Sequence, residues 1–186
     1  MNLMIIRPLE KEDFNAVIKL GCKVHGAGYI DDKELSEIYL KGIKNGINPH
    51  FVAYKNNELV GFRLTYAAGQ WQLDRWCTSK KWPTSPDDVC YFKCNTVAEE
   101  ARGEGLGGKL LDASIQAVKQ QGAKAGVSHL WKQSPNNAAV KYFTKAGGEL
   151  IKEHPNRWNW EFNPDYDCAL CRGECQCTAC EMILVF

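Results

Sequence analysis

The chain has 186 residues and a formal net charge of +1, from 23 basic and 22 acidic side chains. This length suits one domain with a sizeable core, and the balanced charge argues against a dedicated nucleic-acid binder or an electrostatic membrane anchor. The sequence has neither a signal-peptide stretch at its start nor an apolar run as long as a membrane span, so we expect a cytoplasmic protein with no membrane partner.

The first half of the sequence predicts a strand, two helices, a hairpin and a further strand. Helices are indicated where apolar residues recur at helical spacing, and strands where short β-rich runs end at turn residues. In chain order we expect a strand at 3–9, helices at 11–24 and 31–46, a hairpin at 51–68 and a strand at 89–97. Gly46 is the expected end of the second helix.

A stretch of about twenty residues, 69–88, separates the hairpin from the next strand. A connection this long inside a compact domain is generally functional or disordered. Its three tryptophans, Trp71, Trp76 and Trp82, argue against disorder because each can bury a large apolar area.

The second half of the sequence predicts helices and strands in alternation, followed by a final strand. We expect helices at 106–122 and 136–148 and strands at 125–131, 148–154 and 181–186. The whole pattern predicts one α/β domain.

The segment VAEEARGEGLGGKLL, residues 97–111, leads from a strand through a glycine-rich turn into an amphipathic helix. Glycines let backbone N–H groups approach an anion, and the start of a helix adds unpaired donors and a positive dipole end, so the turn predicts a phosphate site. A dinucleotide site would need an acidic residue after the next strand, where Trp131, Lys132 and Gln133 stand. A Walker loop would need Ser or Thr after Lys109.

Two motifs in the chain resemble those of the GNAT superfamily of acyl-CoA-dependent N-acyltransferases. The turn matches the element R/Q-x-x-G-x-G/A through Arg102, Gly105 and Gly107. Downstream, NNAAVKYFTKAGG is similar to the family's N-x-x-A-x-x-x-(Y/F)-x-x-x-G helix, with Asn136, Ala139, Phe143 and Gly147 in register. The order of predicted elements also agrees with that fold.

The resemblance implies a single GNAT-like domain over residues 1–186, of α/β (α+β) class, with a mixed central sheet splayed between strands four and five and flanked by helices. It implies acetyl-CoA as co-substrate, its pyrophosphate held by the glycine-rich turn and its pantetheine arm threaded between the splayed strands. The implied cofactor-binding residues are Val97, Arg102, Gly103, Glu104, Gly105, Leu106, Gly107, Gly108, Lys109, Asn136, Ala139 and Phe143.

For catalysis, the resemblance places Val97 and Asn95 at the reacting end of the fourth strand, where a backbone N–H would stabilise the thioester oxyanion. Family members often carry a carboxylate on this strand, and this one has none. Many also carry a tyrosine at 143 to protonate the departing thiolate. Here Phe143 stands there, and Tyr142 is a candidate acid one residue away, about 100° around the helix. The other candidate bases are Asp74, Asp87, Asp88, Glu58 and His25.

The tryptophan-rich stretch at 69–88 has two interpretations within this fold. It forms a lid or wall beside the acceptor cleft, together with His25 and Tyr29, or it packs onto the sheet edge without a function of its own. The acceptor itself is expected to be a primary amine of a small molecule or peptide. The family often dimerises, so a homodimer is a further expectation.

Five of the nine cysteines lie in the segment CALCRGECQCTAC, which we expect as a loop at 165–180 before the last strand. The pairs Cys168/Cys171 and Cys177/Cys180 can supply four thiolates to a tetrahedral zinc site, with Cys175 as an alternate ligand. A reversible disulfide, an iron–sulfur cluster and an unliganded loop are the alternatives.

The sequence therefore predicts an acetyltransferase in which the amine attacks acetyl-CoA directly in a ternary complex. The alternative is a non-catalytic GNAT-like module that senses acyl-CoA, a metal or redox state. The absent strand-four carboxylate and Phe143 favour this alternative, and the intact glycine-rich turn favours the enzyme.

Overall fold

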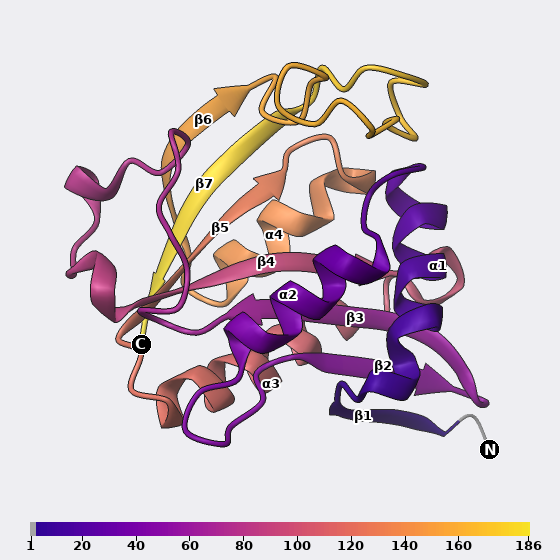
Figure 1. The fold of residues 1–186 in the computed structure, drawn as a ribbon, viewed down its shortest axis with the longest axis horizontal. Coiled ribbons are helices and arrows are strands. Elements are labelled where there is room, and N and C mark those ends of the chain that lie inside the picture. Colours follow the sequence, from indigo (N-terminus) through magenta and orange to yellow (C-terminus); the bar gives the residue numbers. More distant parts are fainter. Residues whose placement is uncertain (1–2) are drawn as a thin grey trace.

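The computed structural model describes residues 3–186 and has seven strands and four α-helices in that range (Figure 1). The expected strands and helices are all present, in the expected order. Their bounds are β1 Met4–Pro8, α1 Phe14–His25, α2 Asp32–Gly42, β2 Phe51–Lys55, β3 Glu58–Tyr66, β4 Val89–Val97, α3 Leu106–Gln120, β5 Ala125–Trp131, α4 Ala138–Lys145, β6 Glu149–Pro155 and β7 Thr178–Val185.

All seven strands form one mixed sheet in the order β1-β2-β3-β4-β5-β7-β6. β4 and β5 pair in parallel, and every other neighbouring pair is antiparallel. The crossover from β4 to β5 contains α3, which is the connection that a parallel pair requires. The expected mixed sheet flanked by helices is therefore confirmed.

Helices cover both faces of the sheet, and β3 shows how they are divided. A Cβ at Gly61 would lie against Leu106 and Leu110 of α3, whereas the ring of the next residue, Phe62, lies against the Cβ position of Gly21 of α1. Since successive strand residues point to opposite faces, α1 and α3 lie on opposite sides. The face of α3 also carries α4, whose Phe143 packs edge-on against Phe92 of β4.

Several predicted boundaries differ from those of the structure, and α2 and β7 show the physical reason. α2 ends at Gly42 instead of Gly46, because Asn45 and Gly46 form a tight turn with φ of 54° and 73°, closed by hydrogen bonds between Lys44 and Ile47. Asn-Gly is the preferred pair for such a left-handed turn. β7 begins at Thr178, three residues before the expected strand, and this places Cys180 inside the sheet.

Within residues 3–186, none of the helices combines the length and the apolar character needed to cross a bilayer.

Candidate functional site

The sheet opens between β4 and β5. Their register pairs run only from Val89 to Tyr91 on β4 and from Ala125 to Val127 on β5. At the fork, the Ser128 hydroxyl donates to the Phe92 carbonyl at 2.8 Å, so a side chain takes the place of the next ladder bond. Beyond this point β4 continues for five residues to Val97 without pairing to β5. The expected splay is confirmed, and it exposes strand edges to a ligand.

The glycine-rich turn stands where β4 ends and α3 begins. Gly103 and Gly105 have φ of 80° and 72°, a conformation that residues with a Cβ rarely adopt. Gly105 is the N-cap of α3, and no side chain among residues 3–186 caps the helix. A Cβ at Gly103, Gly105 or Gly108 would meet no atom of the described part of the chain within 4 Å. The turn therefore presents uncapped helix amides to open space, which is the arrangement of an anion site.

The other residues predicted on this turn have different surroundings. Leu106 is buried under β3 and contributes to the core. Glu104 forms a salt bridge with Lys55 at 3.0 Å, and Lys109 is exposed. The Arg102 Nε donates to the Val97 carbonyl at 3.3 Å, so this guanidinium lies beside the end of β4.

On α4, Tyr142 faces the turn and Phe143 does not. Phe143 is fully buried among core side chains, including Phe92. The ring of Tyr142 lies 3.4 Å from the Cβ position of Gly107, beside the first turn of α3. The family motif puts the aromatic residue of this helix at 143, but the side chain directed at the splay in this chain is that of Tyr142.

Tyr142 is held by a buried cation that the sequence analysis missed. The Nη2 of Arg63, on β3, donates to the Tyr142 hydroxyl at 2.6 Å. The Arg63 side chain is 1% exposed, and its guanidinium lies over the rings of Phe92 and Tyr142 at 5.4 and 5.6 Å. A lone arginine inside the apolar run ELVGFRLTY was the available signal, because a charge is rarely buried without a specific partner.

Asn95, predicted at the reacting end, belongs to the same group. It pairs with Arg63 across the β3–β4 ladder, and its Nδ2 lies 3.8 Å from the Cβ position of Gly107. Its Oδ1 is buried and has no hydrogen-bond partner within residues 3–186. A buried acceptor without a partner is costly unless a ligand supplies the donor.

Asn136 and Ala139 precede Tyr142 in the sequence, and of the two only Ala139 belongs to α4. Asn136 is exposed with φ of 55°, in a short 3-10 turn before α4. The Ala139 amide is capped by the Ser134 hydroxyl at 3.1 Å.

The opposite face of the sheet has an open cleft of about 580 Å³. Tyr66 and Tyr91 of the sheet form its floor, and Trp71 of the 69–88 stretch is one of its walls. Its charged lining consists of three cations, Lys41, Lys93 and Arg157, and one carboxylate, Asp74. This volume is within the usual range for small-ligand pockets.

A buried carboxylate anchors the 69–88 stretch to the sheet. Glu181 of β7 accepts hydrogen bonds from the Thr78 amide and hydroxyl and from the indole of Trp82, all at 2.7–2.9 Å. His154 lies 2.8 Å from the same carboxylate. His129, His154 and Glu181 lie close enough together to bind a metal ion. However, both carboxylate oxygens of Glu181 already accept hydrogen bonds from protein groups. We therefore interpret this group as structural.

Among the candidate bases, the side chain of His25 lies beside the end of β4. Its Nε2 is 2.9 Å from the Thr96 hydroxyl, and its ring stacks on Tyr29 at 4.2 Å. Burial lowers the pKa of His25 to about 4, so it is uncharged at neutral pH and a weak base.

The four candidate carboxylates lie in different places. Asp74 lies in the cleft, 3.4 Å from Arg157. Asp88 pairs with Lys124 at 2.7 Å, Asp87 is in the short 3-10 turn before β4, and Glu58 is exposed at the β2–β3 hairpin.

Glu34 is a further carboxylate that sequence analysis missed. It lies on α2 and is half-buried, and burial raises its pKa while the nearby Lys93 opposes the rise. Its charge also acts on Tyr29 and Tyr66. A half-buried carboxylate with a raised pKa beside a cleft is a candidate proton acceptor.

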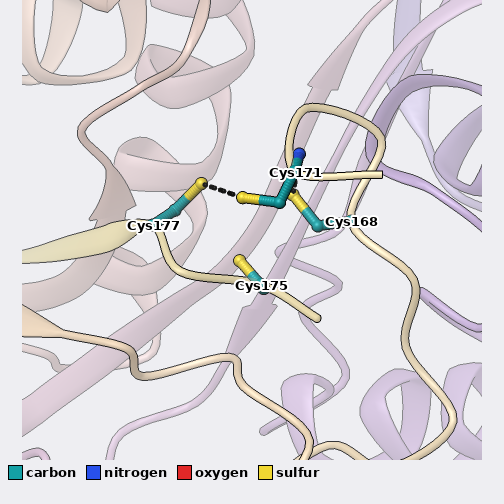
Figure 2. Close-up of side chains that lie close together, drawn as sticks. All are labelled: Cys168, Cys171, Cys175 and Cys177. Atoms are coloured by element: carbon teal, nitrogen blue, oxygen red, sulfur yellow. Dashed lines mark hydrogen bonds between the residues drawn. The ribbon is translucent and has the colours of Figure 1, made fainter. Parts of the chain in front are cut away.

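The cysteine loop, which we define as residues 156–177 between β6 and β7, brings four thiols together (Figure 2). The sulfur atoms of Cys168, Cys171, Cys175 and Cys177 all lie within 4.8 Å of one another. The fourth sulfur of this group belongs to Cys175, the predicted alternate ligand, and not to Cys180. Cys180 is inside β7, where it packs in the core under α4, and Cys175 takes its place.

Comparisons with known proteins agree with this geometry. Residues 18–148 match the model of the acetyltransferase (GNAT) family. A 58-residue stretch is 38% identical to mycothiol acetyltransferase of Corynebacterium aurimucosum, and this covers 31% of the chain but only 18% of that protein.

Solved structures share the fold over nearly the whole chain. An N-acetyltransferase from Staphylococcus aureus Mu50 superposes with a TM-score of 0.67 at 17% identity, covering 98% of both chains. The ribosomal-protein-S18-alanine N-acetyltransferase of Escherichia coli gives 0.65 at 15%, covering 98% of this chain and 94% of that one. Arabidopsis thaliana Naa50, in complex with a CoA–peptide bisubstrate analogue, gives 0.64 at 18%, covering 98% and 99%.

Proposed function

The chain belongs to the acetyltransferase (GNAT) family, and we propose that it transfers an acetyl group from acetyl-CoA to a primary amine by direct attack in a ternary complex. The single observation that carries this proposal is the fork between β4 and β5 ending at an uncapped glycine turn. A diphosphate would bind the uncapped amides at the start of α3, and a thioester would lie along the part of β4 that is not paired with β5.

In this proposal the α3 amides after Gly105 bind the pyrophosphate, with Arg102 beside them. The pantetheine arm runs between β4 and β5, where the orphaned Asn95 Oδ1 can accept a hydrogen bond from one of its amides. The backbone N–H near Val97 stabilises the oxyanion, and losing one such donor typically costs ~3 kcal/mol of barrier stabilisation.

Tyr142 is the proposed acid for the departing thiolate. Because Arg63 donates to the Tyr142 oxygen, the hydroxyl proton is free to point toward the fork. Arg63 thus acts as a positioning residue.

Glu34 is the proposed proton acceptor for the amine. An alkylamine with a pKa near 10.4 needs ~4.6 kcal/mol to lose its proton at pH 7, and β4 carries no carboxylate to take that proton. Glu34 lies on the acceptor side, where its charge acts on Lys93 and Tyr66 of the cleft.

The acceptor occupies the cleft under the 69–88 stretch. Because the cleft is lined by three cations and one carboxylate, it favours an amine that also carries an anionic group, such as an amino acid or a peptide with a free carboxylate.

The test couples calorimetry with a thiol-release assay. CoA is titrated into the purified protein, and acetyl-CoA turnover is then measured with amino acids and with their decarboxylated analogues. We expect CoA to bind, and the amino acids to be acetylated with the higher kcat/KM. If CoA binds and no amine raises turnover above hydrolysis, the sensing module replaces the enzyme. If CoA does not bind at millimolar concentration, the acetyltransferase and the acyl-CoA sensor are both excluded.

A further inference from the structure

We propose that Cys168, Cys171, Cys175 and Cys177 bind a single zinc ion that fixes the cysteine loop across the open end of the β4–β5 fork. This site goes beyond acetyl transfer, because its chemistry is independent of CoA. The inference rests on three observations: the spacing of the sulfur atoms, the backbone around them, and the surroundings of the loop.

The sulfur positions suit one small ion. A tetrahedral zinc with Zn–S bonds of ~2.3 Å holds its sulfurs about 3.8 Å apart. In the structure the Cys171 and Cys177 sulfurs are 3.6 Å apart, and all four lie within 4.8 Å of one another (Figure 2). A multi-iron cluster would separate some of its thiolates further, because they are divided between two or more metal atoms.

The backbone already has the turn that metal–thiolate sites use. The Cys168 amide donates to the Gly173 carbonyl at 2.8 Å, and the Arg172 amide donates to the Cys168 carbonyl at 2.8 Å. Arg172 and Gly173 both have positive φ, of 57° and 141°, which turns the chain back after the CxxC pair.

Two further amides, of Cys171 and Gln176, point at the sulfurs of Cys168 and Cys171 at 3.5 and 3.4 Å. Such N–H donors favour thiolates over thiols.

Turns and hydrogen bonds hold the loop, which has no regular secondary structure of its own. Residues 156–177 contain no helix or strand, and the small apolar cluster beneath them consists of the four cysteines, Trp131, Trp158 and Tyr166. Cys168, Cys175 and Cys177 are no more than 2% exposed. A long loop without regular structure costs conformational entropy, and a metal bound only in the folded state offsets that cost.

Hydrogen bonds join the cysteine loop to the end of α1, whose His25 contacts Thr96 near the end of β4. The Ala169 amide and the Tyr166 hydroxyl both donate to the His25 carbonyl, at 2.9 and 2.8 Å. Ala169 and Leu170, which lie between the first two cysteines, line a groove of about 270 Å³ together with Arg102 and Trp131. A metal at the four thiols would therefore hold one wall of the groove at the end of the fork.

The experiment measures metal content and does not depend on activity. The protein is purified under reducing conditions without chelator, and zinc is quantified for the wild type, for Cys171→Ser and for Cys22→Ser. Cys22 is a matched control, because it is a half-buried thiol on α1 outside the cluster. We expect about one zinc per chain in the wild type and in Cys22→Ser, and at least a fivefold loss in Cys171→Ser.

A second measurement guards against misfolding of the variant. Wild-type protein stripped of metal is titrated with Co²⁺, and we expect the visible bands of a tetrahedral thiolate site to saturate at one equivalent. Zinc should then displace Co²⁺ and change the fluorescence of Trp131 and Trp158, which pack against the cysteines.

Three outcomes overturn the proposal. One is less than about 0.2 zinc per chain together with no Co²⁺ spectrum from reduced protein. Another is bound iron with sulfide. The third is a Cys171–Cys177 disulfide, seen by mass spectrometry in freshly prepared metal-free protein. Since none of these assays uses CoA, a failure here leaves the proposed acetyl transfer untouched.

Discussion

Replacing Tyr142 by Phe removes one hydroxyl at the fork and leaves the aromatic ring in place. In the wild type this hydroxyl accepts from the buried Arg63 at 2.6 Å, and the Arg63 Nε already lacks a partner within the described residues. A hydrogen bond to a charged group contributes ~1.5–3 kcal/mol, so we expect a loss of that size in the free energy of unfolding. The ring contact with the guanidinium is retained.

Activity should fall by more than this loss of stability explains. If Tyr142 protonates the leaving thiolate, kcat should drop about 100-fold, the lower end of the range for general acid catalysis, because a thiol with pKa near ~8.5 leaves readily without help. KM for acetyl-CoA should change little.

Tyr54→Phe is the matched control. Its hydroxyl donates to the ionised Asp13 at 2.7 Å, on β2 away from the fork. We expect the same loss of unfolding free energy in urea titrations and an unchanged kcat. If Tyr142→Phe and Tyr54→Phe differ by less than twofold in kcat under conditions where both are folded, the assignment of Tyr142 as the acid is wrong.

Four further predictions test the turn, the base, the fork and the buried histidines. Gly105→Val should weaken CoA binding about tenfold in calorimetry. Gly46→Val is the control, because Gly46 has a similar φ and equally open surroundings; it should lose a similar free energy of unfolding without a change in CoA affinity. Equal CoA affinities of the two variants would refute the anion site. Glu34→Gln should lower kcat about 100-fold at neutral pH and remove the acidic limb of the pH–rate profile. Glu37→Gln, one helical turn further on, should change neither kcat nor the profile. An unaltered profile in Glu34→Gln would exclude Glu34 as the base. Gly126→Ala should lose ~1–3 kcal/mol of unfolding free energy, because a Cβ there would overlap the Phe92 ring. Gly108→Ala, where a Cβ meets open space on a helix, should gain ~0.5–1 kcal/mol. Wild-type stability of Gly126→Ala would contradict the packing of Gly126 against Phe92. Burial lowers the pKa of His25, His50 and His129 to about 4, below the value in the unfolded chain. Their contribution to the free energy of unfolding is therefore present above pH ~6.5 and is lost as the pH falls toward 4, by roughly 1.4 kcal/mol per pH unit for each histidine. Urea midpoints that stay constant from pH 7 to 5 would show that these residues titrate normally.

The sequence by itself determined the elements and the turn, because both depend on local physics. Helical and strand periodicities are set by the pattern of apolar residues along one element, and β4 and β5 were expected within the bounds that the structure has. The turn was recognised from its density of glycines, and the positive φ of Gly103 and Gly105 is the conformation that this residue type allows. The Asn45-Gly46 turn was also readable locally, and the helix pattern before it was extended too far.

Tertiary structure decided which side chains meet. Arg63, Asn95 and Tyr142 come from three elements, and only the packing of α4 on the sheet shows that Tyr142, and not Phe143, faces the turn. The choice of Cys175 over Cys180 depended on where β7 begins, since a cysteine held in a strand cannot bend toward the loop. Such contacts join residues distant in sequence, and no local periodicity encodes the distance between them.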